Sequence, residues 1–130
     1  MACHVSVVPN GVTQRKTSIS YRAHVALMCG FFGLELNPVD LSQEERAAIP
    51  SILSDWEEIN PIVISGAFYR LAWPGDTNWP AVQFVAQDGT SVVFAFQQMA
   101  TVKPAPSKVW MLRRGTRVTC STERIVARRL

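Results

Sequence analysis

The sequence lacks the cysteine patterns that mark several functional classes. It has three cysteines, Cys3, Cys29 and Cys120, and none of them belongs to a C-x-x-C pair of the kind that binds zinc. An odd number of widely separated cysteines also argues against a disulfide framework. We therefore expect no metal site, no cofactor and no dependence on disulfides.

Long apolar runs are missing as well. No run reaches the roughly 18 residues of a membrane-spanning helix. The amino-terminal residues lack the basic region and apolar stretch of a signal peptide. No N-x-S/T glycosylation sequon occurs either. These absences predict a soluble chain without membrane association, and they leave its compartment open, intracellular or secreted.

Charged residues are scarce, at 18% of the chain, and they are unevenly distributed. Residues 103–130 contain eight Lys/Arg and one Glu, whereas residues 1–102 contain five Lys/Arg and nine Asp/Glu. A basic end can bind nucleic acid. However, no aromatic residue follows Trp110, and no helix-turn-helix or zinc-finger spacing accompanies the arginines. We therefore predict solvated strand edges at this end and no nucleic-acid partner.

What is present begins with apolar segments that fit an α/β pattern. With 130 residues and 48% hydrophobic composition, the chain can bury a core as one domain or as parts of two. Residues 3–8 form a short strand-like run that ends at the Pro9-Asn10-Gly11 turn signal. The segment His24–Leu36 is nearly all apolar and does not alternate, which predicts one strand buried on both faces. Its glycines, Gly30 and Gly33, predict a bend or a close backbone approach.

A helix follows this strand. Ser42-Gln43-Glu44-Glu45 matches the S-x-x-E capping box, and apolar residues then recur at helical spacing. The pattern predicts a helix from about Gln43 to Asn60, ended by Asn60-Pro61. Pro50 predicts a kink in it or its division into two short helices.

After Pro61 the pattern changes to short strands. Asp88-Gly89 stands between two apolar runs, which is the strongest short-range signal for a β-hairpin. In the second run, Phe94 and its neighbours are apolar on both faces, so both faces should be buried. Pro104-Ala105-Pro106 should interrupt the strands. The predicted strands are residues 62–64, 67–72, 81–86, 91–96, 108–113 and 116–120, an antiparallel sheet or sandwich.

Several segments resemble family 36 α-galactosidases, and their amino-acid sequences are most similar to those of fungal members. Those that resemble the last barrel strands and final barrel helix are His4–Asn10, Arg22–Met28, Phe32–Leu36 and Leu41–Arg46. Those that resemble the start of the family's C-terminal β-sandwich are Gly66–Leu71, Asn78–Ala81 and Val92–Gln97. The resemblance covers roughly residues 1–106.

The resemblance implies an α+β chain in two parts. Residues 1–61 would form the end of a (β/α)8 barrel, with its last strands and final helix. Residues 62–130 would form an antiparallel β-sandwich that is incomplete or divergent after residue 107, where the family's closing Gly-Leu turn is not recognisable.

The resemblance also implies retaining hydrolysis of terminal α-galactosyl residues, which needs two carboxylates about 5–5.5 Å apart. In the family these come from Lys-x-Asp and Ser-Asp-x-x-Asp motifs, and neither motif is present here. The chain is therefore expected to be a C-terminal fragment with no catalytic residue, inactive alone. Glu35 and Asp76 are the carboxylates worth testing as substitutes. The implied partners are an α-galactoside, the missing part of the barrel and other copies in a homo-oligomer.

Four residues are candidates for substrate binding. His4 and Asn10 lie where a barrel strand would end, which is where function gathers in this fold, although Gly11 stands where the family often has His. Trp73 and Trp79 flank a turn-rich loop and could stack on a sugar. The alternatives are a structural histidine and tryptophans that pack the sandwich; His24 is expected to be structural. A stand-alone β-rich carbohydrate-binding or interaction module is the alternative for the whole chain.

Overall fold

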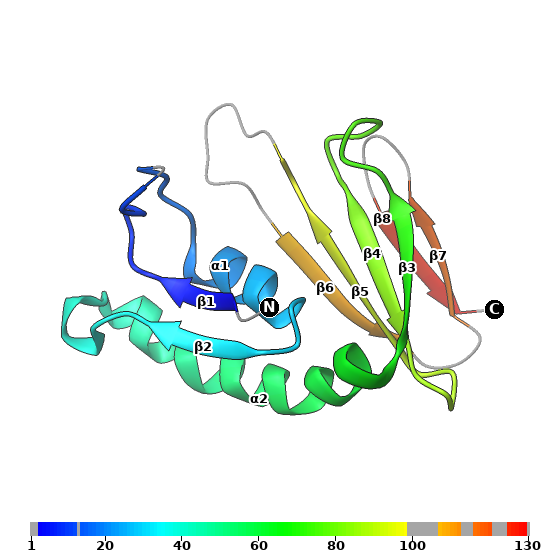
Figure 1. Ribbon diagram of the computed structural model, residues 1–130, viewed down its shortest axis with the longest axis horizontal. Helices are drawn as coiled ribbons and strands as arrows, with labels where there is room; N and C mark the ends of the chain where they lie inside the picture. Colours follow the sequence, from blue (N-terminus) through cyan, green and yellow to red (C-terminus); the bar gives the residue numbers. More distant parts are fainter. Residues whose placement is uncertain (1–2, 13, 99–106, 113–115, 121–124, 130) are drawn as a thin grey trace. The chain divides into compact units, whose positions relative to one another are not determined.

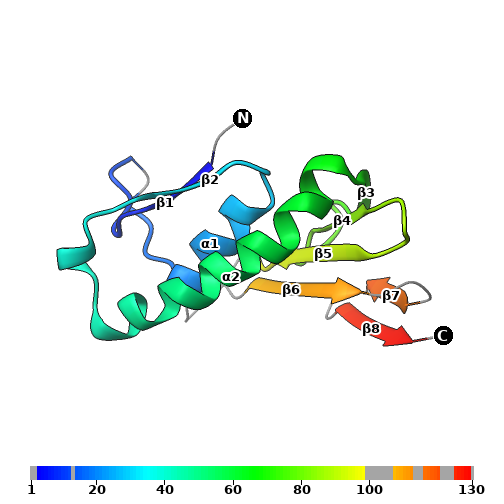
Figure 2. The same cartoon turned by 90° about the horizontal axis from the view of Figure 1, so that it is seen from below.

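The computed structural model describes residues 3–12, 14–98, 107–112, 116–120 and 125–129 (Figures 1 and 2). The chain divides into two compact units, Met1–Asn60 and Pro61–Leu130. The first unit is α/β, and the second contains a four-stranded antiparallel sheet. Among the described residues, no helix has both the length and the apolar character needed to cross a membrane.

The first unit is built on a parallel pair of strands, β1 (Cys3–Ser6) and β2 (Phe32–Glu35). Parallel neighbours need a crossover connection, and α1 (Ile19–Leu27) provides it. Both α1 and the later helix α2 (Gln43–Ser65) lie on the same side of the two strands in Figure 2. The residues that pack together there are Val5, Ile19, Ala23, Ala26 and Ile52, with Cys3, Phe32, Leu36, Ala48 and Ile49 around them.

The prediction of one strand from His24 to Leu36 is wrong, because the first part of this segment completes a helix. The Ser18 Oγ caps α1 by accepting a hydrogen bond from the Tyr21 N–H at 3.2 Å. The chain then turns through Gly30, whose φ is 79°, and β2 begins at Phe32. An apolar run without alternation suits a buried helix and a buried strand equally well, so periodicity alone could not separate the two.

A disulfide joins Cys3 and Cys29, whose Cα atoms are 6.0 Å apart. The sequence analysis argued against a disulfide framework and did not anticipate this bond between two of the three cysteines. Cys3 opens β1 and Cys29 follows α1, 26 residues later in the sequence. The crossover connection brings them together, and no local spacing in the sequence signals such a pairing.

After a short 3-10 helix, η1 (Pro38–Asp40), the long helix α2 runs from Gln43 to Ser65. Its capping box is confirmed, because Glu45 N–H donates to the Ser42 Oγ at 3.1 Å and Ser42 N–H donates to the Glu45 carboxylate at 3.2 Å. The prediction of an end at Asn60 is wrong, as is a strand over 62–64. Each proline removes one backbone donor, and the helix continues through both Pro50 and Pro61 as one element.

The second unit contains a sheet with the order β3-β4-β5-β6, in which all neighbours are antiparallel. The predicted hairpin is confirmed: Gly89 has a φ of 85°, and Thr90 N–H donates to the Asp88 carboxylate at 2.8 Å. The central strand β5 is buried on both faces, and Phe94 is fully buried. The strands are β3 (Ala67–Ala72), β4 (Ala81–Val85), β5 (Ser91–Phe96) and β6 (Ser107–Leu112).

Two further strands pair with each other near the end of the chain, β7 (Thr116–Cys120) and β8 (Ile125–Arg129). The sequence predicted β7 but not β8. The predicted break at Pro104–Pro106 lies outside the described residues, as do Arg113, Arg114 and Arg124.

Candidate functional site

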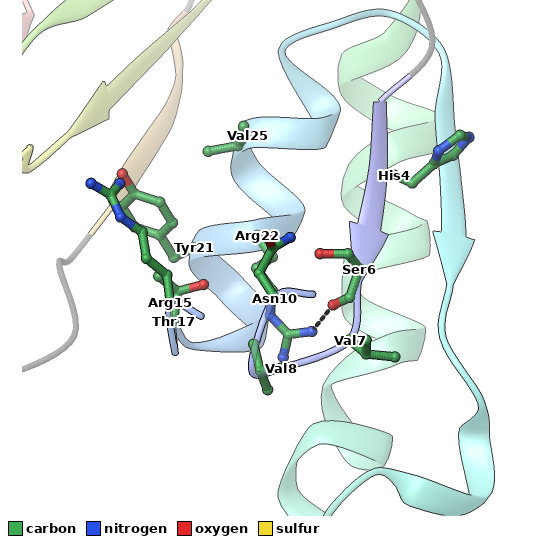
Figure 3. A pocket seen from close by; sticks show the side chains of 10 residues that line it. All are labelled: His4, Ser6, Val7, Val8, Asn10, Arg15, Thr17, Tyr21, Arg22 and Val25. Atoms are coloured by element: carbon green, nitrogen blue, oxygen red, sulfur yellow. Dashed lines mark hydrogen bonds between the residues drawn. The ribbon is translucent and has the colours of Figure 1, made fainter. Parts of the chain in front are cut away.

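A pocket of about 220 Å³ opens in the first unit where β1 ends (Figure 3). Its walls come from β1, from the loop that follows it, and from α1. Two of the four predicted site residues, His4 and Asn10, line it. The complete lining is His4, Ser6, Val7, Val8, Asn10, Arg15, Thr17, Tyr21, Arg22 and Val25.

The loop after β1 is closed by its own hydrogen bonds. Asn10 N–H donates to the Arg15 carbonyl at 3.0 Å, and Gln14 N–H donates to the Asn10 carbonyl at 2.9 Å. The Asn10 side chain accepts from the Val12 N–H at 3.0 Å. Asn10 is therefore a turn residue whose position is set by local backbone bonds, and these bonds hold it at the pocket.

His4 sits on the open face of the parallel strands, where Gly33 of β2 makes room for it. A Cβ atom at Gly33 would lie 2.8 Å from the His4 Cδ2 atom, closer than real contacts allow. On the same strand, a Glu35 carboxylate oxygen lies 3.6 Å from the His4 Nδ1. The nearest neighbour of Gly33 is therefore the His4 ring and not the backbone that the sequence analysis expected.

Arg22 is the residue of this site that the sequence analysis missed. Its side chain is only 7% exposed, yet it carries a charge. One guanidinium nitrogen, Nη1, donates to the Ser6 carbonyl, and the other, Nη2, lies 2.6 Å from a Glu45 carboxylate oxygen. Figure 3 shows the guanidinium group reaching from α1 toward Ser6. No sequence signal marks a buried arginine in advance, because its partners are 16 and 23 residues away.

Burial shifts the pKa of two ionisable side chains of α1, Tyr21 and His24. Burial raises the pKa of Tyr21, which lines the pocket, and the charge of Arg15 partly opposes that rise. Burial lowers the pKa of His24, and the charge of Asp55 partly opposes that fall. His24 is half-buried on α1 and does not line the pocket.

The other two candidates, Trp73 and Trp79, belong to the second unit. Trp73 is 53% exposed, and the Arg70 guanidinium carbon lies 5.1 Å from its ring centroid. Trp79 packs against buried residues of β4 and β5, and the Lys108 Nζ lies 5.5 Å from its ring centroid. Each indole therefore already has a cation over one face, which is a favourable contact in itself.

The two carboxylates singled out as possible substitutes belong to different units. Glu35 belongs to the first unit and faces His4, whereas Asp76 lies in an exposed turn of the second unit. Within the described part of the chain, no group of three His, Cys, Asp or Glu side chains could hold a metal ion.

Comparison with known proteins connects this chain to one group of enzymes. A family model described as Melibiase matches residues 1–66. Alpha-galactosidase 2 of Hypocrea jecorina is 50% identical over 106 residues, which are 81% of this chain and 14% of that protein. Probable alpha-galactosidase G of Aspergillus terreus is 50% identical over 100 residues, 77% of this chain and 14% of that protein.

Solved structures of such enzymes contain the same fold. A crystal structure of a variant of the GH36 alpha-galactosidase AgaA from Geobacillus stearothermophilus, in complex with 1-deoxygalactonojirimycin, superposes with a TM-score of 0.72 at 34% identity. It covers 78% of this chain and 14% of that one. Another variant, in complex with raffinose, gives a TM-score of 0.70 at 33% identity, with the same coverage of 78% and 14%. The chain thus spans about 14% of the length of the relatives that it matches.

Proposed function

We propose that this chain, which belongs to the melibiase family, forms the carboxy-terminal part of an α-galactosidase that releases terminal α-D-galactosyl residues from galactosides. The observation that carries the proposal is the 50% identity to alpha-galactosidase 2 of Hypocrea jecorina over 81% of this chain. Because the match spans 14% of that protein, the activity is proposed for the longer polypeptide. The alternative of a stand-alone carbohydrate-binding module is not favoured, since the match continues through both units.

In this proposal the two units have different places in the enzyme. The β1-α1-β2 unit and α2 would be the last strands and final helix of the (β/α)8 barrel, because a parallel strand pair with a crossover helix is the repeating element of that fold. The antiparallel β3–β6 sheet would begin the C-terminal β-sandwich. The first partner of this chain is then the remainder of the barrel, and the second is another copy of the protein in a homo-oligomer.

The chain would contribute to substrate binding and not to bond cleavage. Active sites of (β/α)8 barrels gather at the carboxyl ends of the strands, and the pocket opens where β1 ends. The His4 imidazole and the Asn10 amide carry donors and acceptors suited to sugar hydroxyls. The nucleophile and the acid/base of a retaining mechanism would come from the rest of the protein.

Trp73 and Trp79 would make a secondary contribution to sugar binding. A sugar that stacks on either ring would use the face away from Arg70 or Lys108, or would displace that cation. We propose this surface as a secondary sugar contact, outside the site that cleaves the galactoside.

A segment exchange tests the proposed function. The matched residues of the Hypocrea jecorina enzyme are replaced by this chain, and hydrolysis of a chromogenic α-galactoside is measured. We expect activity from the exchange protein and none from the 130-residue chain alone, whether or not it carries Glu35→Gln and Asp76→Asn. A folded exchange protein without activity would count against the proposal. Activity of the chain alone that the double substitution abolishes would show that it has its own catalytic carboxylates.

A further inference from the structure

We infer that Arg22, held by Glu45, is a positioning residue that fixes the strand-exit segment, Ser6–Asn10, as a wall of the pocket. Four residues of this segment line the pocket: Ser6, Val7, Val8 and Asn10. That this pocket binds a sugar rests on the proposed function. That Arg22 fixes the position of the segment does not.

The first step is the geometry of the guanidinium group. Arg22 projects from α1 and is almost completely buried, and it contacts the segment by donating to the Ser6 carbonyl. Its other terminal nitrogen lies 2.6 Å from Glu45. A planar guanidinium presents its donors in a fixed fork, so the position of Glu45 determines where the Ser6 carbonyl is held.

The second step is the position of Glu45. One carboxylate oxygen contacts Arg22, while the other accepts the Ser42 N–H at 3.2 Å in the capping box of α2. The same carboxylate therefore ties the start of α2 to α1, and through Arg22 to the end of β1. The capping box holds this helix start in place, which makes this chain of contacts suitable for positioning a loop.

The third step is that apolar burial does not hold the segment. Val7 is 47% exposed and Val8 is 36% exposed, so neither side chain is anchored in a core. The Arg22–Ser6 contact therefore links an exposed segment to the buried body of the unit.

The Arg22–Glu45 ion pair is not needed for stability alone. A buried ion pair replaced by uncharged groups of similar volume often leaves a protein equally stable, whereas removing one partner is strongly destabilising. This difference lets the positioning role be separated from a general contribution to stability. The variant that separates them is Arg22→Met with Glu45→Gln, which removes both charges while Gln keeps the capping box.

The experiment measures ¹⁵N relaxation of the 130-residue chain and of this double variant. In the double variant we expect the backbone order parameters at Val7, Val8 and Asn10, beyond the end of β1, to fall from about 0.85 to below about 0.6, while Ala23 and Ile52 in the core keep theirs. Arg22→Lys is the second variant, in case the first does not fold, because a lysine ammonium cannot form the fork. The matched controls are Glu44→Gln, which removes an exposed charge from the same helix turn, and Arg46→Lys, which replaces an exposed arginine and keeps its charge; both should alter nothing.

The outcomes separate this inference from the proposed function. An unchanged segment, or an equal loss of order throughout the first unit, would overturn the positioning role. In a parallel NMR titration with D-galactose, we expect chemical-shift changes at His4 and Asn10 of the unmodified chain. The affinity that they report should be at least about tenfold lower in the double variant, because the binding groups lose their orientation. Undiminished galactose binding by the double variant would overturn the role in binding. No galactose shifts in the unmodified chain would count against the sugar contact of the proposed function, while the order parameters would still decide the positioning role.

Discussion

Replacing Gly33 by alanine should displace His4 while leaving the stability of the chain nearly unchanged. The new Cβ would meet the His4 ring at 2.8 Å, which is too close, so one of the two must move. The ring belongs to a side chain that is 49% exposed, and rotating it toward solvent costs little. Rotation away from β2 would also lengthen the 3.6 Å contact with Glu35.

The magnitude follows from two opposing effects. Alanine in place of glycine restricts the unfolded chain and stabilises by about 0.4–1 kcal/mol where the backbone accepts it. Moving His4 off its preferred rotamer costs about 0.5–1.5 kcal/mol. The two nearly cancel, so the free energy of unfolding should change by less than about 1 kcal/mol.

The assay combines urea unfolding with the NMR signals of the His4 imidazole. We expect those signals to shift in Gly33→Ala and the unfolding midpoint to stay close to that of the unmodified chain. Gly11→Ala is the matched control, because a Cβ there would have nothing within 4 Å. Imidazole signals that stay in place would refute the argument, as would a loss of stability above about 2 kcal/mol, the range typical of core disruption.

Three further predictions concern stability. Reducing the Cys3–Cys29 disulfide, which closes a separation of 26 residues, should cost about 3.5 kcal/mol; unfolding with and without reductant tests it, and equal midpoints would contradict it. Because burial lowers the pKa of His24, folding favours its neutral form, so its stabilisation is present above about pH 6.5 and is lost as the pH falls through the lower folded-state pKa. His24→Gln should flatten the dependence of unfolding free energy on pH in this window, and an unchanged slope would argue against the shift. Phe94→Ala empties a fully buried position of β5 and should cost about 3–5 kcal/mol, measured by urea unfolding; a cost below about 1 kcal/mol would mean that the sheet is not packed there.

The elements that the sequence predicted correctly are those whose causes are local. The capping box of α2 needs residues three apart, and both of its hydrogen bonds form. The Asp88-Gly89 hairpin needs one glycine with a positive φ and one carboxylate that accepts from Thr90, and both are present. Family membership was likewise accessible from the residues, because it depends on the order of short motifs and not on contacts.

The elements that the sequence could not decide depend on residues far apart in the chain. The sequence analysis ended α2 too early, at Asn60. An interior proline removes one backbone hydrogen bond, and that loss alone does not end a helix. His4 and Asn10 could be proposed from their place beside a turn, but the pocket that unites them required α1 to pack beside β1.

By itself, the sequence determined the family, the hairpin and the start of the long helix, since each follows from neighbouring residues. Tertiary structure alone decided that Cys3 meets Cys29 and that Arg22 is buried between Ser6 and Glu45. The physical reason is that a side chain's burial and partners are set by which segments the crossover connection brings together. A pattern of neighbouring residues carries no information about partners 16, 23 or 26 positions away.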